Sequence, residues 1–412
     1  MERQRAIVVG GGAAGIFAAI ACAEAAPQAE VTVLEKSPRF LSKVRISGGG
    51  RCNVTHHCFE PRELATCFPR GAQELIGAFQ RFQARDTVRW FESRGVKLKT
   101  EKDGRMFPVT DSSETIIDCL MQAAWATGVT MLPNKGLEAV LKHSDGSFLL
   151  RASQGGERVC DQLLLATGGC RTPSAGHLAS SLGHTLETPV PSLFTFHIEE
   201  PWLRELAGVS VEVVEASVTN ARLRERGALL VTHSGLSGPA ILRLSAWGAR
   251  KLAGSNYEFP LRINWLPDLN TETIAAELEA RRKTQAARLV VNAPLSPLPS
   301  RLWEALLKAA ALSPETRWAA LSRPAQHRLI QQLIQTEFNV SGKSLNKEEF
   351  VTCGGVRLKE IDFQTMQSRI CPGLYFAGEL LDIDGITGGF NFQAAWTTGW
   401  IAGTSMARSM RG

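Results

Sequence analysis

A glycine-rich turn between a short apolar run and an alanine-rich segment constrains the fold of this chain more than any other feature. Residues 6–9 are continuously apolar, residues 10–15 have the pattern Gly-x-Gly-x-x-Gly, and residues 16–26 have the composition of a buried helix. A second apolar run at 31–34 ends at Glu35. Strand, glycine turn, helix, strand and acid within about 30 residues predict a βαβ unit of a parallel α/β sheet.

Each glycine of this turn has a physical role in dinucleotide binding. Gly10 permits the tight turn, Gly12 lets a pyrophosphate approach the backbone, and Gly15 lets the helix pack against the strand. The N-terminus of the helix then offers N–H groups to the phosphates. Glu35 is placed to accept hydrogen bonds from a ribose hydroxyl. The alternatives are a turn that binds no ligand and an ordinary surface acid.

A second glycine-rich segment follows a run of basic residues. Between residues 36 and 51 there are five cations and no acid, and residues 47–53 read Ser-Gly-Gly-Gly-Arg-Cys-Asn. Three glycines allow a loop to lie flat against a ligand, and the cations offset the charge of a diphosphate. We therefore expect this loop to reach the bound dinucleotide; the alternative is a flexible, solvated surface loop.

Two further glycine segments close apolar runs later in the chain. Thr-Gly-Gly follows one run at 167–169, and Gly378-Glu379 follows another. A glycine-rich loop and a helix come next, from about residue 392. An acid at a strand end can bind a ribityl hydroxyl, and a helix N-terminus can stabilise negative charge on a flavin. The alternative is that these glycines serve only the turn.

The pattern of secondary structure that the sequence predicts changes twice along the chain. Many short β-like runs follow residue 189, and a helical pattern broken by five prolines extends over 271–338. We predict a discontinuous Rossmann-like α/β domain at 1–188 and 354–412, an inserted β-rich domain at 189–267, and a helical subdomain at 268–353.

Cysteine and charge patterns limit the other classes of protein. The nine cysteines include no Cys-x-x-Cys pair, so we expect reduced thiols in a cytoplasmic protein. Cys52 and Cys58 flank two histidines, but this is not zinc spacing, and we expect no metal. The apolar stretch at 6–26 is too rich in glycine for a membrane span. A net charge of +6 fits an acidic small molecule or cofactor as well as it fits nucleic acid.

The segment 232–239, Thr-His-Ser-Gly-Leu-Ser-Gly-Pro, places His233 beside two serines. It lacks the Gly-x-Ser-x-Gly pattern of a hydrolase nucleophile, so a tight turn is the expected role. A histidine facing a flavin is the secondary hypothesis for His233.

Taken together, the motifs at 10–15, 47–53, 165–169, 232–239 and 373–393 resemble the aminoacetone oxidase-like (BaiN-type) family of FAD-binding proteins. That family is akin to the two-dinucleotide-binding-domain flavoproteins that include fumarate reductase. The resemblance covers essentially the whole chain and implies non-covalent FAD. It implies that the ADP half is held by Gly10, Gly12, Ala13, Ala14, Gly15, Glu35 and Lys36, and that adenine is contacted by the backbone of Leu137. It implies that the flavin is lined by Ser47, Gly49, Arg51, Cys52 and Asn53, and that the adenosine or pyrophosphate passes Thr167, Gly168 and Gly169. It implies that the ribityl chain and ring are held by Gly378, Glu379, Asp384, Gly389, Phe390, Asn391, Gln393 and Ala394.

These observations predict an FAD-dependent oxidoreductase that passes hydride between flavin N5 and a small organic substrate. The candidate catalytic residues are Arg51, to bind an anionic group, and His233, to move a proton. With no second dinucleotide motif, NAD(P)H is expected only as a transient electron donor. Nucleic acid is not the expected partner, and the oligomeric state is open. The alternatives are a flavin-dependent RNA-modifying enzyme and a flavin-bound sensor without turnover.

Overall fold

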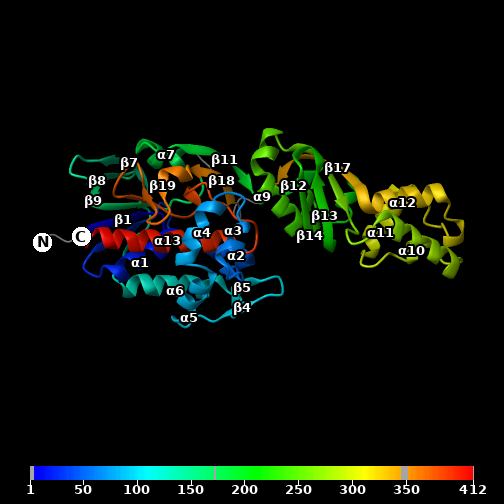
Figure 1. The fold of residues 1–412 in the computed structure, drawn as a ribbon, viewed down its shortest axis with the longest axis horizontal. Helices are drawn as coiled ribbons and strands as arrows, with labels where there is room; N and C mark the ends of the chain where they lie inside the picture. Colours follow the sequence, from blue (N-terminus) through cyan, green and yellow to red (C-terminus); the bar gives the residue numbers. More distant parts are fainter. Residues whose placement is uncertain (1–3, 171–172, 345–350, 412) are drawn as a thin grey trace. The chain divides into compact units, whose positions relative to one another are not determined.

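The fold is known from a computed structural model, which describes residues 4–170, 173–344 and 351–411. Its contacts group the chain into two compact units, residues 1–191 with 347–412 and residues 192–346. The first unit combines the two ends of the chain (Figure 1).

A seven-stranded sheet forms the centre of the first unit, with the order β19-β20-β21-β10-β1-β2-β6. The five strands from β21 to β6 are parallel, whereas β19 and β20 pair antiparallel at one edge. The strands are β1 (Arg5–Val9), β2 (Glu30–Leu34), β6 (Thr130–Leu132), β10 (Gln162–Leu165), β19 (Ile361–Asp362), β20 (Gln367–Ser368) and β21 (Leu374–Phe376). Four of the five residues of β1 are buried, which explains its continuous apolar sequence. The predicted Rossmann-like α/β fold is confirmed.

Helices and three small sheets complete the first unit. The helices are α1 (Ala13–Ala25), α2 (Ser42–Gly50), α3 (Pro61–Thr66), α4 (Ala72–Arg81), α5 (Ala84–Glu92), α6 (Ser113–Ala126), α7 (Pro173–Ser181) and α13 (Phe390–Ser409). The small sheets are β3 (Thr55–His56), β5 (Arg105–Pro108) and β4 (Leu98–Thr100); β7 (Leu137–Lys142), β8 (Phe148–Ala152) and β9 (Glu157–Cys160); and β11 (Leu186–Ser192) with β18 (Val351–Val356).

A closed barrel forms the core of the second unit, and helices pack beside it (Figure 1). In barrel order the strands are β12 (Thr195–Ile198), β15 (Gly235–Ser237), β14 (Leu223–Thr232), β13 (Ser210–Val218), β16 (Glu258–Asn264) and β17 (Thr336–Ser344). The helices are α8 (Pro201–Arg204), α9 (Pro239–Gly254), α10 (Thr271–Thr284), α11 (Ser300–Ala309) and α12 (Arg323–Gln335).

The barrel departs from the sequence prediction at β17. We expected the helical pattern to continue to residue 338, but α12 ends at Gln335 and Thr336 begins a strand that pairs with β12 and β16. No glycine or proline separates the helix from the strand, so the sequence carries no stop signal. Within the part of the chain that the structure describes, no helix combines the length and hydropathy needed to cross a membrane.

Candidate functional site

The N-terminus of α1 lies open at the carboxyl edge of the parallel sheet. Gly12 precedes the helix in an extended conformation, and no side chain caps the helix. A Cβ atom placed on Gly12 would meet no atom within 4 Å. The first N–H groups of α1, with their partial positive charge, are therefore accessible to an anion such as a diphosphate.

The other two glycines of the turn are required by the chain itself. Gly10 has a φ of +114°, and a Cβ atom there would lie 2.2 Å from the carbonyl oxygen of Ala166. A Cβ atom on Gly15 would lie 1.9 Å from the carbonyl oxygen of Gly10. Gly10 and Gly15 thus fix the approach of strand and helix, whereas Gly12 keeps the space in front of the helix clear.

Two hydrogen bonds hold the carboxylate of Glu35 beside this turn. One oxygen accepts from the N–H of Gly11 at 2.7 Å, and the other accepts from the N–H of Ser37 at 2.8 Å. Each carboxylate oxygen keeps acceptor capacity for a ribose hydroxyl. Lys36 follows directly, and a Cβ atom on Gly136, next to Leu137, would lie 3.3 Å from the Cβ of Lys36. Lys36 thus lies beside the residue that precedes Leu137, as expected if both Lys36 and Leu137 contact the adenosine.

The segments that follow β10 and β21 meet near the start of α1. A Cβ atom on Gly378, which has a φ of +71°, would lie 2.8 Å from the Cβ of Ala14. Gly168, after Thr167, has a φ of +78° and open space around it, whereas a Cβ atom on Gly169 would contact Thr352 and Glu379. The hydroxyl of Thr352 is buried without a hydrogen-bond partner among the described residues.

Helix α13 runs beside α1 in the same direction at very close range. A Cβ atom on Gly399 would lie 2.5 Å from the carbonyl oxygen of Ala14, and one on Gly403 would lie 2.1 Å from that of Ala18. Because α13 begins nine residues before Gly399 and α1 begins one residue before Ala14, the α13 N-terminus extends about 12 Å beyond that of α1 at a rise of 1.5 Å per residue. Two helix N-termini therefore face one edge of the sheet at staggered positions.

Two asparagine side chains form hydrogen bonds with the backbone around the N-terminus of α13. Gly389 caps the helix in the left-handed conformation, and no side-chain cap is present. Asn53 accepts from the N–H of Gly389 at 2.9 Å and donates to the carbonyl of Thr55 at 3.0 Å. Asn391 exchanges two hydrogen bonds with the backbone of Gly385, which closes the preceding loop. Asn53 and Asn391 thus act on the backbone that surrounds this helix end.

Gln393 lies next in α13, and its side chain is fully buried within the protein. Its amide oxygen accepts from the hydroxyls of Thr55 at 2.6 Å and Thr87 at 2.9 Å, and its amide nitrogen donates to Thr397 at 3.0 Å. Gln393 anchors α13 to β3 and α5, and Ala394 beside it is also buried.

The triple-glycine segment is included at the end of α2, but its own backbone is not α-helical, in keeping with the loop we expected. The backbone leaves the helical conformation at Ser47, and Gly48 and Gly49 are left-handed. A Cβ atom on Gly49 would meet no atom within 4 Å, so this stretch presents open backbone. Cys52 is fully buried, and burial raises the pKa of its thiol to about 12, so it is a neutral thiol.

Arg51, a predicted catalytic residue, is engaged by neighbouring side chains. Its Nη1 lies 2.7 Å from Glu101 and 3.5 Å from Asp111, and its guanidinium lies 4.0 Å from the ring centre of Phe107. The hydrogen bond that Arg51 donates to Glu101 is the main cause that raises the pKa of Arg51. Arg51 is therefore a fixed cation and not a proton donor.

Two long-range ion pairs involve acids that the sequence assigns to the cofactor. Glu379 pairs with Lys43, and it also accepts from the N–H of Thr352 at 2.7 Å. Asp384 is fully buried and pairs with Arg70. Both carboxylates organise the chain, and their contact with the ribityl group stays a prediction.

His56 is a candidate site residue that sequence reasoning missed. Its ring stacks on Phe390, the first residue of α13, at 4.7 Å between centroids, and its Nε2 lies 3.0 Å from the carbonyl of Asp103. Nε2 is thus the donor, and Nδ1 is a buried acceptor without a partner among the described residues. Burial is the main cause that lowers the pKa of His56. The pattern Thr-His-His offered a signal, but we considered it only as a metal site.

His233 lies in the second unit. It is exposed in the two-residue turn between β14 and β15, which a hydrogen bond from Thr232 to the carbonyl of Gly235 closes at 3.1 Å. The structure therefore shows the expected tight turn, and proton transfer by His233 stays a prediction. Across residues 4–170, 173–344 and 351–411, no three His, Cys, Asp or Glu side chains form a group that could hold a metal.

Comparison with known proteins identifies the family. The model of the HI0933-like protein Rossmann domain matches residues 4–405. The chain belongs to this family. Its relatives include a ribosomal RNA dihydrouridine synthase of Escherichia coli, 32% identical with 97% of each chain covered. They also include a 3-dehydro-bile acid delta(4,6)-reductase of Clostridium scindens, 30% identical with 97% of this chain and 98% of that protein covered.

Solved structures share the fold. The 3-ketosteroid-delta4-(5alpha)-dehydrogenase of Rhodococcus jostii superposes with a TM-score of 0.51 at 15% identity, with 99% of this chain and 98% of that chain covered. The chain is therefore an FAD-dependent oxidoreductase. The two staggered helix N-termini, the clear space at Gly12 and the unpaired acceptor of His56 fit FAD, which has a diphosphate at its centre and an N–H donor on its pyrimidine ring.

Proposed function

We propose that this protein reduces a carbon–carbon double bond conjugated to a carbonyl group, and that the bond belongs to a uracil ring of ribosomal RNA. The observation that carries the proposal is the naming of two relatives, 32% and 28% identical along nearly their whole length, as ribosomal RNA dihydrouridine synthases. Dihydrouridine is uridine with two hydrogens added across a ring double bond next to a carbonyl.

The bile acid reductase supports the same reaction class. Its name describes the reduction of a ring double bond in a 3-oxo steroid. Both reactions add a hydride to one carbon and a proton to the other, and the carbonyl accepts negative charge between these steps. The RNA substrate takes up an alternative that the sequence left open, in place of the small molecule we expected.

The chain contributes binding and orientation to this reaction. When bound, FAD supplies the hydride from N5. The N–H groups at the start of α1 would hold the diphosphate, and the carboxylate of Glu35 would accept from a ribose hydroxyl. The N-terminus of α13 would face the pyrimidine edge of the flavin, where its partial positive charge favours the anionic, reduced form. His56 would accept a hydrogen bond there through Nδ1.

Two electrons must enter for each product molecule, and we propose that NADH or NADPH supplies them transiently. The test combines purified protein, FAD and each nicotinamide with unmodified ribosomal RNA transcript or with a 3-oxo-4,6-diene steroid. We expect RNA-bound uridine to gain two hydrogens, measured by mass spectrometry of digested nucleosides. Reduction of the steroid alone would assign a small-molecule substrate, and reduction of neither compound, despite bleaching of the flavin, would overturn both assignments.

A further inference from the structure

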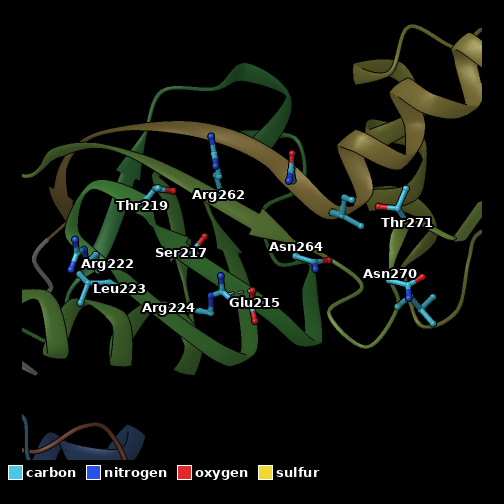
Figure 2. Close-up of a pocket in the computed structure, with 13 residues that line it drawn as sticks. Glu215, Ser217, Thr219, Arg222, Leu223, Arg224, Arg262, Asn264, Asn270 and Thr271 are labelled. Atoms are coloured by element: carbon cyan, nitrogen blue, oxygen red, sulfur yellow. Dashed lines mark ion pairs between the residues drawn. The ribbon is translucent and has the colours of Figure 1, made fainter. Parts of the chain in front are cut away.

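We propose that a groove on the outer face of the barrel in the second unit binds the phosphodiester backbone of RNA. The inference rests on the proposed function, because it names where an RNA substrate is held. The groove encloses about 620 Å³ and is lined from β13, β14 and β16, the start of α10 and the end of α12 (Figure 2).

Strand register brings two arginines to opposite sides of a hydroxyl. Ser217 on β13 pairs with Arg224 on β14 and with Arg262 on β16. Because neighbouring strands lie about 4.8 Å apart, the two arginine backbones are about 10 Å apart with the serine between them. Figure 2 shows Ser217 between Arg262 and Arg224. Two guanidinium groups and a hydroxyl form a donor row across the groove.

A third arginine extends this row. Arg222 follows the short helical turn 219–221 with a φ of 54°, a left-handed conformation that is uncommon outside glycine. It is exposed, and among the described residues no ion pair or hydrogen bond engages its guanidinium. Figure 2 shows it beside Leu223. The strained backbone thus directs an uncommitted cation to the groove.

The ion pairs already present in the groove are exposed and readily exchanged. Arg224 lies 3.5 Å from Glu215, and their side chains are 72% and 23% exposed, respectively. Arg262 lies 2.8 Å from Glu337, which is 63% exposed. Such pairs contribute little in water, whereas a phosphate group matches the guanidinium fork with two charge-assisted hydrogen bonds. Phosphate can therefore compete with the carboxylates for these guanidinium groups.

The lining also excludes an apolar ligand. Of the 13 lining residues, only Leu223, Leu269 and Ile334 carry hydrocarbon side chains. Asn264, Asn270, Gln335 and the lining hydroxyls offer further donors to phosphate and sugar oxygens, whereas Glu215 can only accept. A steroid would meet few apolar side chains here, whereas a nucleic-acid backbone would meet several guanidinium, amide and hydroxyl donors.

The test measures binding of a fluorescently labelled RNA stem-loop with unpaired uridines, over a range of salt concentrations. The triple variant Arg222→Gln, Arg224→Gln, Arg262→Gln removes three charges from the groove. The control Lys283→Gln, Lys308→Gln, Arg323→Gln removes three exposed charges elsewhere in the same unit. We expect the groove variant to bind at least about tenfold more weakly, with a log–log salt slope smaller by about 2, since each lost phosphate contact on single-stranded RNA removes roughly 0.7. The control variant keeps the affinity and slope of the original protein.

Two outcomes overturn the groove assignment: equal binding by the two triple variants, and no binding of the stem-loop by the original protein. The proposed function fails separately, if the original protein with FAD and NADPH forms no dihydrouridine in ribosomal RNA. Flavin content and thermal midpoint, measured on both variants, show that they are folded.

Discussion

Replacing Gly12 by aspartate is expected to leave the apoprotein as stable or slightly more stable toward unfolding, and to weaken FAD binding. The backbone of Gly12, with φ −85° and ψ −171°, is open to any residue, and a Cβ atom there meets nothing within 4 Å. Aspartate is a favoured N-cap, and its charge at a helix N-terminus stabilises by about 0.3 to 1 kcal/mol. The apoprotein of Gly12→Asp should therefore be equally or slightly more stable in urea unfolding.

The same carboxylate would stand where the diphosphate binds. A unit charge about 4 Å from a phosphate charge costs about 4 kcal/mol at an effective dielectric constant of 20, and half of that at twice the distance. We therefore expect the Kd for FAD to rise about 30- to 1000-fold, measured by titrating apoprotein with FAD and following flavin fluorescence.

The matched control is Gly12→Asn, which has the same shape and capping ability without the charge. We expect it to weaken FAD binding much less than Gly12→Asp. Equal weakening by both variants would refute the electrostatic argument, and an unchanged Kd in the aspartate variant would refute the placement of the diphosphate at α1.

Three further outcomes follow from the packing and polar contacts of the first unit. His56→Phe should raise the Kd for FAD about 2- to 10-fold by removing one hydrogen bond, whereas His57→Phe, at the exposed neighbour, should not. Burial lowers the pKa of His184 below 6.5, so the unfolded chain binds a proton at a higher pH than the folded chain does. The free energy of unfolding, measured in urea, should therefore fall as the pH drops below about 6.5, and His184→Gln should reduce this dependence. Gly403→Ala forces a Cβ into the backbone of α1 and should cost about 1 to 3 kcal/mol, seen as a lower Tm, whereas Gly254→Ala, which meets open space, should not.

Local patterns predicted the part of the fold that depends on neighbours in sequence. The apolar run of β1, the glycine turn and the alanine-rich α1 together specify a βαβ unit, and the structure confirms it. The short helical stretch that precedes Ser47 was missed, because the basic residues before the glycines carry no clear helical pattern, whereas the glycines themselves are non-helical, in keeping with the predicted loop. The β17 strand was missed because α12 runs into it without a stop signal.

Contacts between distant residues explain what the sequence could not reveal about the site. Asp384 pairs with Arg70, 314 positions away in the sequence, and Gln393 accepts a hydrogen bond from Thr55, 338 positions away. A single sequence shows these polar residues but not their partners. It therefore cannot distinguish a residue that anchors the fold, such as Gln393, from one that contacts a ligand. The orphaned Nδ1 of His56 likewise becomes visible only once Phe390 and Asp103 surround the ring.

The central claim is that the staggered N-termini of α1 and α13 hold a flavin dinucleotide by its ADP half as well as by its ring. Calorimetric titration of the apoprotein with FAD and, in parallel, with FMN tests it most directly. The account predicts one FAD bound per chain and much weaker binding of FMN, because FMN lacks the half that α1 and Glu35 would hold. Equal affinity for the two flavins, or no heat with either, would contradict it.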